Sequence, residues 1–396
     1  MAVAADRLSI RWYLGYDLDE PLPDHSSLTR IRQRVGLAVF RQFFETVLDR
    51  CAAAGLIWGR ELLVDATKVP GNADLGSLVP RLKDVVDDHL IELFGNQTAS
   101  PTSEYWDVLE TCQLPPNRPL SPGYERVSHR MVSRTDPDAT PMTLAPGQTV
   151  LEYQDHYLVD GGRARIILSC LVMSADVMEN QPFLDQFRRT LFRRRLRPQR
   201  VIGDTAYGTV ENLQAMEQAG IQLMTPLPNW EKSSPYFKTA AFTYAAEQDV
   251  YYCPNGETLT LRNIDTTNER KQYRAPVTSY RACLLRDQCT SNRRGRVIYR
   301  SFHEELLARV LADEGTPAFE QAMRKRRVWV EPLFAEAKQW HGLNCFRLSG
   351  VHNVNIEGVL IAAGQNLKRY LAKRGWGKRW GPMGRLVISD ITAFDG

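Results

Sequence analysis

The sequence predicts a mixed α/β fold, and three observations along the chain lead to this prediction. Two short apolar runs, residues 62–64 and 201–202, have the composition of buried strands, and each is soon followed by an aspartate. Residues 151–159 and 164–172 lie on either side of a Gly-Gly turn and predict an antiparallel hairpin. Residues 180–195 place apolar side chains at helical spacing. This order of strands and helices is typical of a sheet covered by helices.

Other helical and β-rich regions lie around this predicted sheet. Residues 8–16 resemble the end of a helix, and two further helices are expected to meet near Phe40. Residues 230–315 contain short β-forming runs separated by Gly, Asn and Thr, which predicts a β-rich insertion. Helical periodicity returns at Phe319 and again over residues 350–370.

The composition is globular, and the length of 396 residues suggests two or three domains. The net charge of +4 does not by itself identify a nucleic-acid partner. Basic residues nevertheless cluster at 188–200, 324–327 and 368–379. A single cluster of this kind is typical of a solvated helix face, but three clusters near candidate catalytic segments favour a polyanionic partner.

The cysteines and the hydropathy pattern indicate a cellular compartment. Seven cysteines, an odd number scattered over the chain, do not form the pattern of a secreted disulfide framework. The first residues lack the apolar core of a signal peptide, and no apolar run approaches the roughly 20 residues of a membrane helix. We therefore expect a cytoplasmic protein with no membrane partner.

Three cysteines of the β-rich region raise the question of a metal site. Cys253, Cys283 and Cys289 are followed by His303, and three Cys with one His are a ligand set for structural Zn²⁺. However, five residues separate Cys283 from Cys289, more than the two to four that are usual, and Cys253 is isolated. The pattern disfavours zinc but leaves it open.

Three acidic residues far apart in the sequence are the candidate catalytic groups. Asp65 and Asp204 follow buried strands, and Glu331 lies on a predicted helix. Carboxylate oxygens held by rigid elements suit Mg²⁺, and a pair of such ions catalyses phosphoryl transfer. Each residue also has a plainer interpretation, because an Asp is common in turns and caps and a Glu in surface ion pairs. Asp136 and Asp138 similarly suit either a metal contact or a turn.

The segment around Glu331 adds positive charge to this picture. On a continuous helix, one narrow face would carry Arg324, Arg327, Glu331 and Lys338. Glu336 would point well away from that face and is the weaker candidate. Pro332 either starts a helix or kinks one at this place. Cations beside a carboxylate suit a phosphodiester substrate.

The chain resembles the bacterial insertion-sequence transposases of the DDE type, which have a ribonuclease-H-like fold. Residues 324–338 are similar to that group's Y-x2-R-x3-E-x6-K signature at Arg327, Glu331 and Lys338, with Arg324 in place of the tyrosine. The resemblance covers nearly the whole chain, including the β-rich insertion. Further similar segments are Leu63-Val-Asp-Ala-Thr67, Thr135-Asp-Pro-Asp-Ala139, Val201-Ile-Gly-Asp-Thr-Ala-Tyr-Gly208 and Gln365-Asn-Leu-Lys368.

The resemblance implies a DNA transposase that cleaves DNA and transfers strands at insertion-sequence ends. Asp65, Asp204 and Glu331 would then hold two Mg²⁺ ions, for which Mn²⁺ may substitute. Arg324, Arg327 and Lys338 are expected to contact DNA, although the missing tyrosine leaves the contact at residue 324 open. The implied partners are inverted-repeat ends, target DNA and a second copy of the chain in an active homodimer, associated with the bacterial nucleoid.

Two alternatives stay open at this point. One is a catalytically inactive DNA-binding relic, which the arginine at position 324 favours. The other is a metal-dependent DNA nuclease that does not transfer strands. Relatives usually carry more helical sequence before the position of Met1, so a shortened DNA-binding region is expected at the start of the chain.

The resemblance and the composition together predict five parts. They are a helical N-terminal region (1–56), the first part of a ribonuclease-H-like catalytic domain (57–230), the β-rich insertion (231–315), the last part of the catalytic domain (316–372) and a basic tail (373–396).

Overall fold

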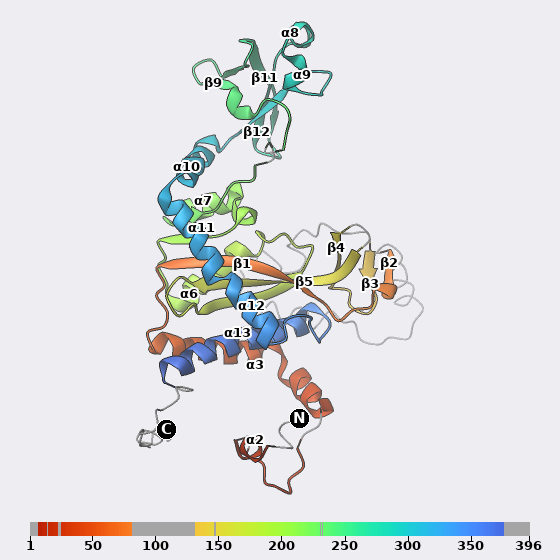
Figure 1. The fold of residues 1–396 in the computed structure, drawn as a ribbon, viewed down its shortest axis with the longest axis vertical. Coiled ribbons are helices and arrows are strands. Elements are labelled where there is room, and N and C mark those ends of the chain that lie inside the picture. Colours follow the sequence, from red (N-terminus) through yellow and green to blue (C-terminus); the bar gives the residue numbers. More distant parts are fainter. Residues whose placement is uncertain are drawn as a thin grey trace. The chain divides into compact units, whose positions relative to one another are not determined.

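The computed structural model describes residues 7–13, 15–22, 25–80, 131–145, 148–229, 231 and 233–375. The chain divides into two compact units (Figure 1). Unit 1 comprises Met1–Pro198 and Trp329–Gly396, and unit 2 comprises Gln199–Val328. The expected basic tail lies almost entirely outside the described residues. Each unit is described below by itself.

The N-terminal part of unit 1 is helical. Helix α2 covers Leu8–Tyr13 and helix α3 covers His25–Ala53. The sequence predicted two helices meeting near Phe40, but the interruption lies at Gly36, whose φ of 64° and ψ of 178° are not helical. A positive φ is strained for residues with a Cβ, so the break falls on the glycine rather than four residues later.

The sheet of unit 1 is antiparallel. Its strands are β1 (Glu61–Pro70), β4 (Thr140–Ala145), β5 (Gln148–Asp160) and β6 (Ile167–Ser174). Strand β5 pairs with β1, β4 and β6. The register of β5 and β6, from Tyr153 opposite Ser174 to Val159 opposite Ile167, confirms the predicted hairpin. A separate pair consists of β2 (Leu78–Pro80), which follows the short helix η1 (Leu75–Ser77), and β3 (Met131–Ser133).

Three helices pack around this sheet: α6 (Phe183–Arg194), α12 (Glu331–Trp340) and α13 (Val351–Lys373). Helix α13 lies beside α3 and packs on β6 (Figure 1). Two asparagines of α13 bind the backbone of β6. Asn355 accepts a hydrogen bond from the Val172 N–H and donates one to its carbonyl, and Asn366 does the same at Ile167. The core below includes Leu151, Tyr153, Val172, Ala337 and Phe346, all at most 2% exposed.

Unit 2 begins with a parallel pair of strands. Strand β7 (Arg200–Ile202) pairs with β8 (Gln222–Met224), and between them lie the short helix η2 (Thr205–Tyr207) and helix α7 (Val210–Gln218). Helices α10 (Glu304–Glu314) and α11 (Pro317–Trp329) close the unit. Helices, antiparallel strands and a parallel pair together confirm the mixed α/β class predicted from the sequence.

The rest of unit 2 is a five-stranded antiparallel sheet. After the short helix η3 (Thr239–Ala241), its strands follow one another in sequence order: β9 (Thr243–Ala245), β10 (Val250–Tyr252), β11 (Thr258–Asp265), β12 (Arg270–Arg274) and β13 (Val297–Ser301). Helices α8 (Val277–Ala282) and α9 (Arg286–Cys289) connect β12 to β13. One face of the sheet is filled by Phe242, Tyr251, Leu259, Tyr273 and Ile298.

Candidate active site

Asp65 lies in the middle of β1, behind three residues that anchor the strand. Leu62, Leu63 and Val64 are at most 1% exposed, so β1 is fixed in the core before the carboxylate is reached. Asp65 itself is 7% exposed, and its Oδ1 accepts a hydrogen bond from the Ala66 N–H at 3.0 Å. The aspartate is therefore held on a rigid strand.

Helix α12 packs against the part of the sheet that contains Asp65. In the register of β1 and β5, Asp65 lies opposite Tyr157, and the Tyr157 ring stacks on Phe334 of α12 with centroids 4.5 Å apart. One turn further along the helix, Lys338 Nζ donates to Thr67 Oγ1 at 3.0 Å. Glu331 is the first residue of this helix and is exposed. Phe334 and Lys338 thus tie the helix of Glu331 to the strand of Asp65.

The segment around Glu331 is not one continuous helix. Helix α11 ends at Trp329, and α12 begins at Glu331 with Pro332 in its first turn. Proline has no N–H to donate to the preceding turn but is well suited to a helix start. The shared face expected for residues 324–338 is therefore interrupted. A carboxylate in the first turn is also favoured by the helix dipole.

Asp204 lies two residues after β7, at the start of η2 in unit 2. Its Oδ1 accepts a hydrogen bond from the Ala206 N–H at 2.9 Å, so the carboxylate caps η2. The half-buried side chain follows Val201 and Ile202, which are fully buried. The turn ends at Gly208, where a glycine is needed because a Cβ would lie 2.9 Å from the Pro226 carbonyl oxygen. The turn thus presents Asp204 from a rigid base.

The two candidate arginines lie on α11. Arg324 is exposed and lies 3.9 Å from Glu320 in an i,i+4 ion pair. Arg327 is exposed, and in the described part of the chain no acidic side chain pairs with it. Lys338, by contrast, has its ammonium engaged with Thr67 and with the Lys68 carbonyl oxygen at 3.3 Å.

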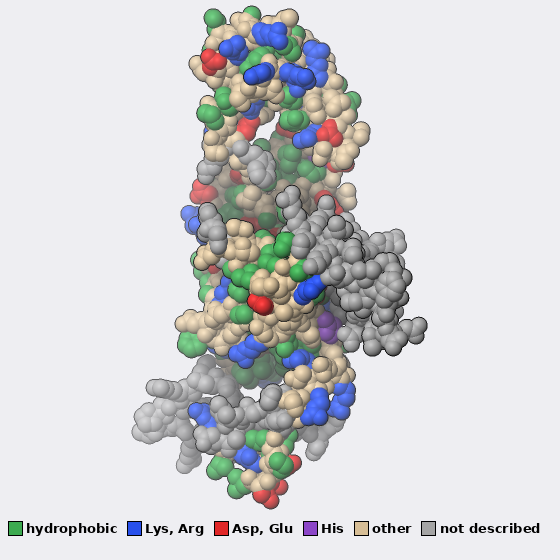
Figure 2. Space-filling view, turned by 90° about the vertical axis from the view of Figure 1, so that its right-hand side faces the viewer, with side chains coloured by type: hydrophobic (Ala, Val, Ile, Leu, Met, Phe, Trp, Pro, Cys, Tyr) green, Lys and Arg blue, Asp and Glu red, His purple; other side chains and the backbone are tan. Residues whose placement is uncertain are grey.

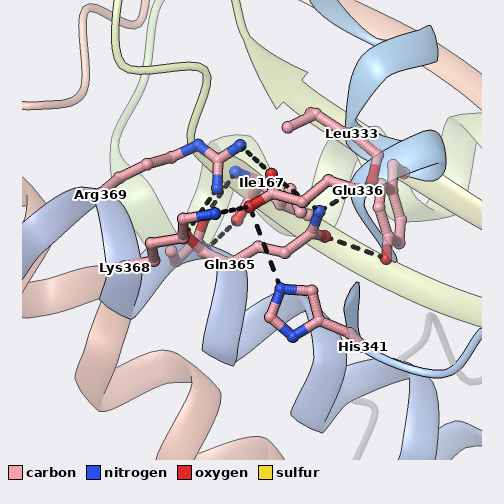
Figure 3. Close-up of polar contacts among 9 residues, drawn as sticks. Ile167, Leu333, Glu336, His341, Gln365, Lys368 and Arg369 are labelled. Carbon is pink, nitrogen blue, oxygen red and sulfur yellow. Dashed lines mark hydrogen bonds and ion pairs between the residues drawn. The ribbon is translucent and has the colours of Figure 1, made fainter. Parts of the chain in front are cut away.

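Glu336 belongs to a separate network that joins α12 to α13 (Figure 3). Its carboxylate accepts hydrogen bonds from Arg369 and Lys368, both at 2.8 Å, and from the Gln365 amide at 3.3 Å. Gln365 also donates to the Leu333 carbonyl oxygen at 2.8 Å. Burial would raise the pKa of Glu336, but the hydrogen bonds from Lys368 and Arg369 outweigh it and lower the pKa to about 2. Glu336 therefore acts as a structural anion.

The Thr135–Ala139 motif holds the start of α13. Asp136 Oδ1 accepts hydrogen bonds from the Tyr153 hydroxyl and the Gly350 N–H, and Asp138 Oδ2 accepts one from the Val351 N–H. Desolvation raises the pKa of the buried Asp136 carboxyl. Of the two interpretations of this acidic cluster, these contacts favour the capping one.

Sequence reasoning did not identify Asp155, a fully buried carboxylate on β5. It lies opposite Thr67 in the register with β1, and its Oδ1 accepts a hydrogen bond from Cys170 Sγ at 3.4 Å. Its Oδ2 has no hydrogen-bond partner among the described residues. Desolvation raises the pKa of Asp155 to about 7. An aspartate within the predicted strand of residues 151–159 was the available signal.

Three of the four candidate zinc ligands line one pocket, and the fourth, His303, does not. The three cysteines Cys253, Cys283 and Cys289 line one pocket in unit 2, and none forms a disulfide. His303 instead contacts Gln214 and Glu269. Among the described residues, no three Asp, Glu, His or Cys side chains are grouped so that they could hold a metal ion.

Comparison with known proteins gives one family match. Residues 252–371 match the model of a family described as "Transposase DDE domain". No curated protein and no solved structure matches the chain. The matched segment contains Glu331 and the cations around it, whereas Asp65 and Asp204 precede it. Over these residues, the match confirms the resemblance to DDE-type insertion-sequence transposases. In the described residues, no helix is long and apolar enough to cross a membrane.

Proposed function

We propose, from the premise that the chain carries a DDE-type transposase domain, that it is a DNA transposase of an insertion sequence. It cleaves DNA at the ends of the element and transfers the freed 3′ ends to target DNA. The observation that carries the proposal is the family match over the helix of Glu331. The packing of that helix, through Phe334 and Lys338, on the strand of Asp65 supports it.

In this proposal Asp65, Asp204 and Glu331 are the catalytic carboxylates on a ribonuclease-H-like domain. Their oxygens are the donors that Mg²⁺ prefers, and Mn²⁺ binds similar ligands. Two such ions supply an activated oxygen nucleophile and stabilise the leaving oxygen. The anchored strand of Asp65 and the capped turn of Asp204 fit this role because each holds its carboxylate in a fixed direction.

The cations near Glu331 have the proposed role of binding phosphates. Arg327 is exposed and suited to a backbone phosphate. Lys338 combines this role with its hydrogen bond to Thr67, which leaves one ammonium proton for DNA. Arg324 already pairs weakly with Glu320 and would contribute least. Synapsis of two ends makes a homodimer the expected active form.

A cleavage assay with paired variants tests the proposal. The substrate is a labelled duplex that carries the inverted repeat flanking the gene, incubated with a target plasmid and Mg²⁺. Asp204→Asn is expected to abolish cleavage while DNA binding stays close to wild type. Asp74→Asn is the control, because Asp74 caps η1 through the Gly76 N–H as Asp204 caps η2. That variant should keep full cleavage.

The products separate the proposal from its alternatives. Products joined to the target plasmid support a transposase, whereas cleaved ends without joining indicate a nuclease. Binding without any Mg²⁺- or Mn²⁺-dependent cleavage indicates an inactive DNA-binding relic. Loss of cleavage and of DNA binding together in Asp204→Asn would mean that Asp204 is a structural cap.

A further inference from the structure

The five-stranded sheet of unit 2 has a second face that its hydrophobic core does not use. Along β12, Tyr273 points to the core, so its neighbours Gln272 and Arg274 point to the opposite side. On β13, Ile298 is in the core and Tyr299 is on the opposite side, 48% exposed. In the register of the two strands, Gln272 lies opposite Tyr299. We call the set Arg270, Gln272, Arg274 and Tyr299 the basic face.

The part of the chain that carries the basic face holds all of the protein's excess positive charge. Residues 258–301 contain ten Lys or Arg and three Asp or Glu, a net charge of 10 − 3 = +7. The whole chain has a net charge of +4, so the remaining residues sum to 4 − 7 = −3. Several Lys and Arg side chains gather on this part of the surface (Figure 2). Such a local excess attracts polyanions even where the whole chain is nearly neutral.

The two arginines of the basic face keep N–H groups available for an external ligand. The Arg270 guanidinium lies 4.3 Å above the centre of the Tyr299 ring, and its Nε donates to Asp265 at 3.1 Å. These contacts fix the guanidinium but leave its terminal N–H groups available. Arg274, four residues along the same strand, makes no ion pair among the described residues, and its Nε is buried without a partner.

Further exposed cations lie next to this surface. Arg262 is exposed at the β-bulge of β11, between Leu261 and Asn263. Arg293 and Arg294 are exposed in the turn that leads into β13, at the end of the sheet where Arg274 lies opposite Val297. In the described residues none of these three arginines has an acidic partner.

We propose that the basic face binds the phosphodiester backbone of duplex DNA, as a contact surface separate from the carboxylates. Arginines on neighbouring positions of a sheet hold their guanidinium groups at a fixed spacing, which suits a regular array of phosphates. On the strands of this sheet, Val250 and Val297 are the large aliphatic side chains on the side opposite the core, so a hydrophobic protein partner is a poor fit. The inference rests on the proposed function for the identity of the polyanion.

DNA binding as a function of salt concentration tests this inference. The full chain is titrated into a short fluorescent duplex of arbitrary sequence, without divalent metal, and anisotropy is recorded at several salt concentrations. In Arg270→Gln/Arg274→Gln the affinity should fall at least several-fold, and the slope of log K against log salt should decrease by about 2, one for each lost phosphate contact. Arg270→Lys/Arg274→Lys should keep most of the slope.

Arg286→Ala/Arg309→Ala is the matched control. It removes the same charge from α9 and α10 of the same unit, at positions that do not belong to the basic face, and both side chains are at least half exposed. If this control loses as much slope as the Gln variant, the effect is one of net charge, and the inference is wrong. Equal thermal unfolding midpoints of the variants show that the sheet is intact. If the Gln variant is unfolded, two other variants decide. Tyr299→Leu removes the ring beneath the Arg270 guanidinium and should weaken DNA binding, whereas Arg270→Lys/Arg274→Lys should keep most of the slope.

The outcomes also distinguish this inference from the proposed function. If wild-type protein cleaves and joins DNA while the Gln variant binds with unchanged slope, the proposed DNA contact of the basic face is wrong and the proposed transposase function is supported. If no cleavage is found with any metal but the Gln variant loses affinity and slope, DNA binding by the basic face is supported and the proposed catalytic function is wrong.

Discussion

Lys338 Nζ lies 3.0 Å from Thr67 Oγ1 and joins α12 to β1 two residues beyond Asp65. This contact connects two segments that are 271 residues apart in the sequence. It means that a cation of the transposase signature has a structural partner inside the protein. The effect of Lys338 on folding and its proposed contact with DNA can therefore be separated by changing one partner at a time.

Thr67→Val and Lys338→Met are expected to differ in DNA binding. Thr67→Val removes only the acceptor, so the free energy of unfolding should fall by about 1 kcal/mol while DNA affinity stays unchanged. Lys338→Met should lower stability similarly and also reduce the salt dependence of DNA binding by a slope of about 1. Urea unfolding and anisotropy titrations measure the two effects. Equal loss of DNA affinity in both variants would show that Lys338 only positions α12.

Glu336→Gln is expected to loosen the contact between α12 and α13. The Arg369 side chain is 14% exposed and would keep its charge without its partner, so the free energy of unfolding at neutral pH should fall by about 2 kcal/mol. Cleavage activity should fall as well, because α12 carries Glu331. Glu320→Gln, which affects only an exposed ion pair, is the control and should change stability little.

The pH dependence of the Glu336 variant follows from its lowered pKa. The Glu336 carboxyl has an ordinary pKa of 4.5, and its pKa in the folded protein is about 2. Its ionised form therefore stabilises the fold. The stability difference between wild type and Glu336→Gln should be constant above pH 4.5 and shrink as the pH falls toward 2. A difference that is independent of pH over this window would contradict an ionic role.

Asn355 and Asn366 should each be needed for the docking of α13 on β6. Alanine at either position leaves one buried N–H and one buried C=O of β6 without a partner, which should cost about 3 kcal/mol. Hydrogen exchange should speed up at the Val172 amide in one variant and at the Ile167 amide in the other. Asn353→Ala removes a single bond to Ser349 and should cost less than about 1 kcal/mol. Exchange that speeds up equally at both amides in both variants would indicate global unfolding instead.

The elements that carry the candidate carboxylates were predictable because their signals are local. Three apolar residues before Asp65 and two before Gly203-Asp204 indicate buried strands, although β1 continues past Asp65 to Pro70. The sequence left open whether Pro332 starts or kinks a helix, and in the structure it lies in the first turn of α12. Strand β12 was not predicted, because Arg-Lys-Gln-Tyr-Arg lacks an apolar alternation. It forms because β11 and β13 pair with it on both sides.

Contacts between distant residues were beyond sequence reasoning. In the sequence, Glu336 resembles a member of an ion pair on the surface of its own helix, but its partner Arg369 lies 33 residues away on another helix. Asn366 contacts Ile167 across 199 residues. Neither partner can be identified from spacing, since helix period and strand alternation fix only which side of an element a residue occupies. The family match identifies the segment of Glu331 but not these supports.

Asp155→Asn is expected to stabilise the protein at neutral and alkaline pH. The folded protein keeps this buried carboxyl protonated up to a pKa of about 7, whereas the unfolded chain ionises it near 3.8. Wild-type stability therefore falls between pH 3.8 and 7, and the asparagine removes this loss. The gain should be absent below pH 3.8 and reach roughly 2–4 kcal/mol above pH 7. Urea unfolding in EDTA at a series of pH values measures it.

Cys170→Ala tests the cause of this behaviour. The Cys170 thiol donates to Asp155 Oδ1, and this bond lowers the carboxyl's pKa against the larger effect of desolvation. Without the thiol the pKa of Asp155 should rise above 7, so the loss of stability with pH should extend further into the alkaline range. The cavity left by the thiol lowers stability equally at every pH and does not change this slope. A stability profile of Asp155→Asn that runs parallel to wild type would show that the carboxylate is already ionised in the folded protein, held by charges such as that of Lys338.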